Sequence, residues 1–175
     1  MLSKLDEIKS RRTDITDWVV HWTRMETIGD GRTKSSWDIL KEILHCGYLR
    51  PSKAPRLVGA KNQKEWCDTI RGEVPVVCFS EQTLKARLES FLADARRYSG
   101  CGVAFEKRSL FQYGGRPVIY GDDGLLARLH RDDKYLWVKY DPLPHAPREY
   151  SIDWTHEREW RARVLDYNHP EFGRK

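Results

Sequence analysis

Apolar and polar residues alternate most regularly in residues 154–165, near the C-terminal end of the chain. Trp160, Ala162 and Val164 lie on one face of an extended segment, which we expect to pack on the core. The opposite face carries two carboxylates and two guanidinium groups, which are those of Glu157, Glu159, Arg161 and Arg163. At roughly 3.3 Å per residue, this polar row would follow about 20 Å of strand.

Shorter apolar runs bounded by turn residues predict further strands. The predicted strands are residues 16–23, 74–80, 100–106, 116–120 and 135–140. Residues 24–34 are expected to form a loop. Gly121, Asp122 and Asp123 are expected to form a turn, with a divalent metal site as the alternative.

Helical periodicity occurs in two segments. The first begins with Ser35 or Ser36 as a cap and runs to about Cys46, and Gly47 is expected to end it. The second covers residues 81–98. Its apolar residues fall on one face, which comprises Leu84, Leu88, Phe91, Leu92 and Ala95.

Helices are therefore expected in the N-terminal half and strands mainly in the C-terminal half. This order predicts an α+β domain with a mainly antiparallel, split sheet, rather than a βαβ nucleotide-binding fold. The chain also lacks the GxGxxG and GxxxxGK[ST] motifs. With 175 residues, we expect a single domain over 1–175, with residues 1–14 as a polar N-terminal helix or arm.

Composition narrows the classes of partner. The net charge of +5 mildly favours a polyanionic partner, so nucleic acid remains possible beside a phosphorylated ligand. The four cysteines form no CxxC pair, which argues against a zinc knuckle, and the preferred nucleotide site is expected to need no metal. The sequence has no signal peptide and no apolar stretch of 18 residues, which predicts a cytoplasmic protein with free thiols and no membrane partner.

Several short motifs follow one another in a recognisable order over residues 17–163. They are VVHWT, ILKEILHCGYLRPS, VVCFSE, GCGVAFEK, PVIYGD and EREWR. This order resembles the bacterial AbiGi-type abortive-infection family, and more distantly the DarT-like ADP-ribosyltransferases. The resemblance implies an ADP-ribosyltransferase-like fold and a role in antiphage defence or a toxin–antitoxin pair. It also implies a possible protein partner encoded alongside.

The same resemblance implies a site for NAD, as substrate or ligand, built from three strands. His21 matches a first-strand residue that holds a ribose, and Ser80 matches a middle-strand residue that shapes the nicotinamide pocket. Glu159 matches the late-strand glutamate that is catalytic in such enzymes. A carboxylate fixed on a strand stabilises the positive charge of an oxocarbenium-like transition state by about 3–4 kcal/mol.

Three neighbouring residues extend this nucleotide-binding set. Thr23 is expected either to bond a ribose hydroxyl or simply to pair across strands, and Glu157 competes with Glu159 for the late-strand position. Arg161 is expected either to hold Glu159 ionised or to bind a phosphate. If these interpretations hold, His21, Thr23, Ser80 and Glu159 converge in one pocket, and a structure with His21 and Glu159 on opposite faces of the sheet would overturn this NAD site.

Structural interpretations of the same residues stay open. His21 is equally suited to be a core histidine bonded to a backbone carbonyl. Ser80 can instead cap a helix that begins at Glu81, with Thr83 as the competing cap. The Glu159–Arg161 pair can be an ordinary ladder on the wet side of a sheet.

Three functions therefore compete. The first is an enzyme that transfers or cleaves the ADP-ribose part of NAD. The second is a metal-dependent nuclease, with carboxylates from 153–159 and a lysine such as Lys139. The third is a non-catalytic module that senses a nucleotide or neutralises a partner.

Five cations in 50–64 are expected either to remain solvated or to close over phosphates, namely Arg50, Lys53, Arg56, Lys61 and Lys64.

Overall fold

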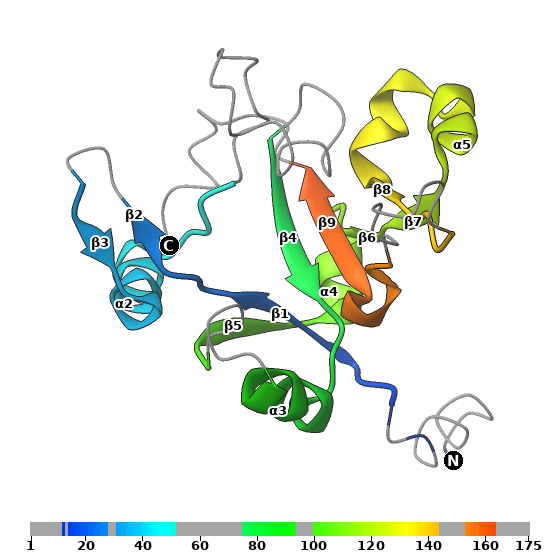
Figure 1. The fold of residues 1–175 in the computed structure, drawn as a ribbon. Helices are drawn as coiled ribbons and strands as arrows, with labels where there is room; N and C mark the ends of the chain where they lie inside the picture. Colours follow the sequence, from blue (N-terminus) through cyan, green and yellow to red (C-terminus); the bar gives the residue numbers. More distant parts are fainter. Residues whose placement is uncertain are drawn as a thin grey trace, which may run out of the picture.

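A five-stranded antiparallel sheet forms the centre of the molecule (Figure 1). The computed structural model describes residues 12, 14–27, 31–51, 75–93, 100–143 and 153–163. The strand order is β5-β1-β4-β9-β6, so the first strand pairs with two strands that follow it much later in the chain. The strands are β1 (Trp18–Trp22), β4 (Val76–Ser80), β5 (Gly102–Glu106), β6 (Arg116–Pro117) and β9 (Glu159–Arg163).

Two small sheets accompany the central one. A hairpin joins β2 (Glu26–Thr27) to β3 (Thr33–Lys34) within the segment expected to be a loop. The other small sheet pairs β7 (Ile119–Gly121) with β8 (Trp137–Lys139) in parallel. The predicted mixture of helices with a mainly antiparallel sheet is confirmed.

The first long helix follows its sequence signals closely. Helix α2 (Ser36–Cys46) begins after Ser35, whose side chain accepts a hydrogen bond from the Asp38 amide. It ends at Gly47, which has a φ of 73° in the left-handed region that glycine adopts without strain.

The prediction that helices cluster in the N-terminal half is wrong. Helices α4 (Lys107–Gln112) and α5 (Asp123–Arg128) lie in the second half, with the 3₁₀ helices η2 (Arg131–Leu136) and η3 (Thr155–Glu157). The expected turn at Asp122 proves to be a helix cap, because its Oδ1 accepts a hydrogen bond from Leu125 N at 2.8 Å. The predicted strand at 135–140 begins only at Trp137.

Buried apolar residues cover both faces of the central sheet. One cluster contains Val19, Val77 and Phe79 with Leu110 from α4. The other contains Val76 with Tyr135 and Leu136 from η2. Because the sheet is covered on both faces, the strands carry apolar residues at consecutive positions.

Helix α3 (Leu84–Ala93) has its leucines on the outside. Leu84, Leu88 and Leu92 are 80%, 58% and 73% exposed, so these three residues of the predicted apolar face lie on the surface. The buried side of the helix carries Arg87, whose guanidinium lies 4.2 Å from the centre of the Trp22 ring. On the buried side of α3, the contact is thus a cation over an aromatic face.

Within the ranges the structure describes, no helix is both long and apolar enough to cross a membrane.

Candidate functional site

The strand register divides the predicted site residues between the two faces of the sheet. Val20 pairs with Ser80, and Ser80 pairs with Glu159, so these three side chains share one face. His21 alternates to the other face, where its ring lies 5.9 Å from that of Phe79. The expected pocket that joins His21 to Glu159 is therefore not formed, so these strands do not build the predicted NAD site.

Arg161 and Glu159 form a buried ion pair that links two sheets. Arg161 Nε lies 2.8 Å from Glu159 Oε1, and Nη2 lies 3.2 Å from Oε2. Nη1 donates to the carbonyl oxygens of Tyr135 at 2.5 Å and Trp137 at 3.1 Å. Arg161 is only 1% exposed, and burial beside this pair raises the pKa of the Cys78 thiol.

This arrangement changes the interpretation of the polar row on β9. The row is not the wet side of a sheet, since η2 and β8 cover Arg161. Of the two roles expected for Arg161, orienting Glu159 agrees with the geometry. Binding a phosphate does not, because the guanidinium is buried and bonded to protein oxygens.

Ser80 joins the end of β4 to the segment before β9. Its Oγ donates to the Glu157 carbonyl oxygen at 2.8 Å, and Gln82 Nε2 donates to that of His156 at 3.1 Å. Helix α3 begins at Leu84, and Thr83 Oγ1 accepts from Ala86 N at 3.3 Å, so Thr83 supplies the cap in place of Ser80.

Thr23 is also used internally. It is 2% exposed, and its Oγ1 lies 2.9 Å from the Ser36 carbonyl oxygen and 3.1 Å from that of Cys101. These bonds tie the end of β1 to the start of α2 and to the chain before β5. The hydroxyl is therefore not presented to a ligand.

His21 differs from the other candidates because one of its ring nitrogens stays unused. Nδ1 lies 2.8 Å from the Cys78 carbonyl oxygen. A carbonyl oxygen can only accept a hydrogen bond, so Nδ1 is the donor and carries the proton. Burial lowers the pKa of the imidazole, and the ring is neutral at pH 7. No hydrogen bond of Nε2 to another described residue is formed, and the side chain is half-buried, so Nε2 is the ring atom left as a hydrogen-bond acceptor.

The shifted imidazole should make stability depend on pH. An unfolded histidine titrates near about 6.5, and the folded pKa of His21 lies below its ordinary value. Between these pKa values the unfolded state binds more protons, so the free energy of unfolding falls as pH drops through this window. His21→Asn places an amide donor near the position of Nδ1 and cannot be protonated, so it should flatten the profile.

Urea unfolding between pH 5 and 7.5 measures this effect. His45→Asn is the matched control, because His45 is exposed on α2, and its profile should follow that of the original protein. A pH profile that His21→Asn leaves unchanged would contradict the buried neutral state.

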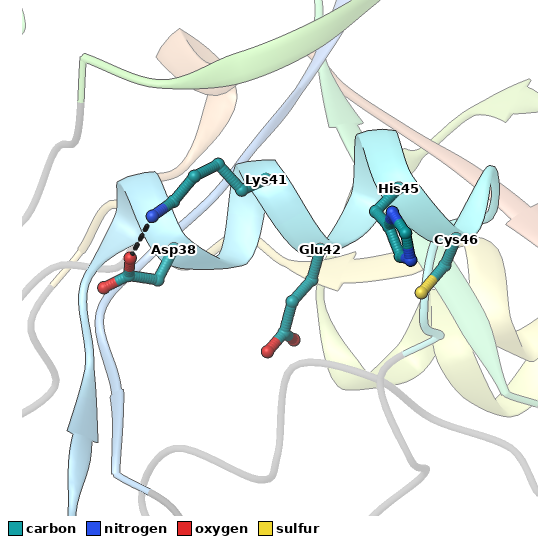
Figure 2. A pocket seen from close by; sticks show the side chains of 5 residues that line it. All are labelled: Asp38, Lys41, Glu42, His45 and Cys46. Carbon is teal, nitrogen blue, oxygen red and sulfur yellow. Dashed lines mark ion pairs between the residues drawn. The ribbon is translucent and has the colours of Figure 1, made fainter.

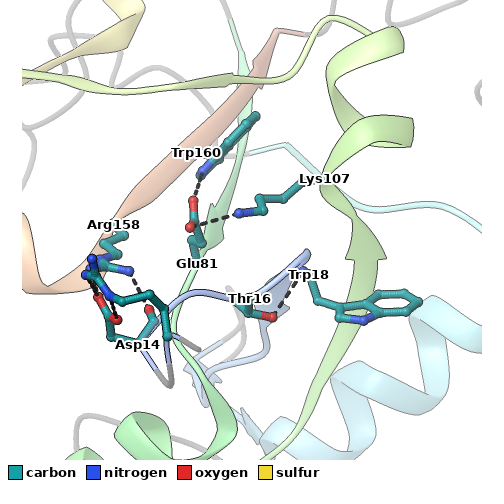
Figure 3. A network of polar contacts seen from close by, with 8 residues as sticks. Asp14, Thr16, Trp18, Glu81, Lys107, Arg158 and Trp160 are labelled. Carbon is teal, nitrogen blue, oxygen red and sulfur yellow. Dashed lines mark hydrogen bonds and ion pairs between the residues drawn. The ribbon is translucent and has the colours of Figure 1, made fainter. Parts of the chain in front are cut away.

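A polar cluster that the sequence did not reveal lies at the end of β4 (Figure 3). Glu81 accepts from Trp160 Nε1 at 2.9 Å and from Lys107 Nζ at 2.9 Å, so β4, β9 and α4 meet at one carboxylate. Beside it, Arg158 Nη2 lies 3.1 Å from Asp14 Oδ2, across 144 positions of sequence. Both oxygens of Glu81 are paired, which makes this cluster part of the framework of the sheet.

A shallow hollow of about 340 Å³ lies on the surface of α2 (Figure 2). It is lined by Asp38, Lys41, Glu42, His45 and Cys46. Asp38 pairs with Lys41 at 2.7 Å, and Glu42 pairs with Lys34. The acidic groups are thus neutralised by neighbouring lysines, as on a solvated helix surface.

The residues considered for a nuclease are not assembled. Lys139 pairs with Asp123 at 3.3 Å, and Asp153 accepts from Thr155. Among the residues that the structure places, no group of three or more His, Cys, Asp or Glu side chains could hold a metal ion. Of the cations in 50–64, Arg50 lies 3.9 Å from Glu42, and the other four lie outside the described residues.

No family model, curated protein or solved structure matches this chain.

Proposed function

We propose that this protein binds a ribose-bearing nucleotide, NAD or ADP-ribose, at His21, as part of bacterial antiphage defence or a toxin–antitoxin pair. The observation that carries the proposal is the half-buried imidazole of His21, whose tautomer is fixed by the Cys78 carbonyl and whose Nε2 makes no hydrogen bond to another described residue. Ribose hydroxyl groups are donors, and such a nitrogen is a suitable acceptor for one of them. Fixing the ring before binding reduces the entropy lost when the ligand docks.

Two further arguments support a nucleotide. The AbiGi-type and DarT-like resemblance implies a first-strand histidine against a ribose, and His21 occupies that strand. The net charge of +5 favours an anionic ligand.

The proposed activity is binding rather than ADP-ribose transfer through Glu159. His21 and Glu159 lie on opposite faces of the sheet, and Glu159 is held by Arg161. A catalytic carboxylate has to reach the ribose that the protein binds, and a ligand on the His21 face lies on the wrong side of the sheet for Glu159. The geometry therefore favours a nucleotide-sensing or partner-neutralising module among the three functions.

Removing the acceptor tests the proposal. His21→Asn should keep the bond to the Cys78 carbonyl and raise the dissociation constant for NAD or ADP-ribose about tenfold, or about 1.4 kcal/mol, because one hydrogen bond is lost. Calorimetric titration with NAD, ADP-ribose and a cyclic nucleotide measures the change. His45→Asn is the matched control and should bind as the original protein does.

Glu159→Gln distinguishes this proposal from the enzymatic one. Binding at His21 predicts an unchanged dissociation constant and no nicotinamide release by the original protein. If the original protein releases nicotinamide from NAD and Glu159→Gln abolishes that release, the protein is an enzyme and the binding proposal is wrong. Equal affinity in His21→Asn would remove His21 from the site.

A further inference from the structure

The exposed leucines of α3 form a continuous apolar row. Leu84, Leu88 and Leu92 are spaced four residues apart, so they follow one another along one side of the helix. Each is more than half exposed, whereas Arg87, which lies outside this row, is 5% exposed. Single exposed leucines are ordinary on a protein surface, whereas an aligned row of them gives a partner a continuous apolar strip to contact.

Two charges flank this leucine row. Lys85 and Glu89 are exposed, and neither forms an ion pair or hydrogen bond with another described residue. Their order along the helix, with the lysine before the glutamate, is the weaker orientation for a pair within one helix. Both charges thus remain available to a partner.

We propose that α3 docks antiparallel on the α3 helix of a second copy of this chain. Two antiparallel copies of α3 are related by a two-fold axis, which brings the same flank of both helices together. When Lys85 of one copy lies level with Glu89 of the other, two opposite-charge pairs form, each between Lys85 of one copy and Glu89 of the other. In the same register, Leu84 of one copy lies midway between Leu88 and Leu92 of the other, so the leucine rows interdigitate.

The size of this surface sets the expected strength. Ten residues of helix at 1.5 Å per residue give a contact only about 15 Å long, and one such helix pair cannot bury the roughly 1,200–2,000 Å² of a stable interface. The copies should therefore exchange between monomer and dimer as the protein concentration changes. This association is independent of nucleotide binding at His21.

Sedimentation equilibrium of the full chain over a wide concentration range tests the dimer. Leu88→Lys should raise the dimer dissociation constant at least tenfold. Leu143→Lys is the matched control, because Leu143 is 71% exposed outside α3, and it should dimerise as the original protein does. A chain that stays monomeric throughout, or a dimer unaffected by Leu88→Lys, overturns the proposal.

Charge exchange tests the antiparallel register. Lys85→Glu and Glu89→Lys should each weaken self-association, because each places like charges opposite one another. An equimolar mixture of these two variants should restore association as a heterodimer, since every pair is again of opposite sign. A mixture as weak as the separate variants would show that the leucines bind in another arrangement, which also overturns the proposal.

Discussion

Replacing Arg161 with methionine should lower the free energy of unfolding by about 3–5 kcal/mol. The substitution keeps much of the side-chain volume and removes the buried partner of Glu159. It also leaves the Tyr135 and Trp137 carbonyl oxygens without their donor. Uncompensated buried polar groups account for the size of the effect, which urea unfolding measures.

Arg131→Met provides the comparison for Arg161→Met. Arg131 pairs with Asp132 on the surface, and its side chain is 91% exposed. Exposed pairs of this kind contribute about 0–1 kcal/mol, so this variant should unfold almost as the original protein does. Equal losses in the two variants would show that Arg161 does not join the two sheets.

Truncating Trp137 to alanine should have a comparable effect, with a loss of about 3–5 kcal/mol. The side chain is fully buried, and its Nε1 donates to the Asp122 carbonyl oxygen at 3.1 Å. The substitution would open a cavity between β8 and the start of α5 and leave that carbonyl without its donor. Thermal and urea unfolding should both report the loss.

Trp37→Ala is the control for the size of the side chain. Trp37 is 56% exposed on α2, so its truncation should cost about 1 kcal/mol or less. If Trp137→Ala proved as mild as Trp37→Ala, the attachment of the small β7–β8 sheet would not depend on this side chain.

Elements with strong local signals could be predicted from the sequence. Helix α2 has a serine cap, apolar residues at helical spacing and a terminal glycine, and its observed bounds agree with these signals. Strands β1, β4 and β9 were predicted from their apolar residues. Helices α4 and α5 have six residues each, which is too short for helical periodicity to appear.

The arrangement of the site could not be predicted, because it depends on register. Alternation within β1 tells which residues share a face of that strand. It does not tell which residues of β4 or β9 share that face. A shift of one residue between strands exchanges the faces, and only pairing such as Val20 with Ser80 fixes it.

The two arginine contacts show a second limit of sequence patterns. Arg161 and Arg87 occupy positions where an apolar side chain would be the ordinary choice, and both are buried. Arg161 is satisfied by backbone carbonyls from η2 and β8, and Arg87 lies over Trp22. Such partners are distant in sequence, so hydrophobic patterning alone does not reveal that either arginine is buried.

The central claim is that a nucleotide binds at Nε2 of His21, and nitrogen NMR of ¹⁵N-histidine-labelled protein tests it most directly. His21→Asn identifies the two ring resonances by their disappearance. At pH 7, we predict a protonated Nδ1 and an unprotonated Nε2, whose resonance shifts to saturation as NAD or ADP-ribose is added while Nδ1 changes little. His21 resonances that neither ligand shifts, or an Nδ1 found without its proton, would contradict the account.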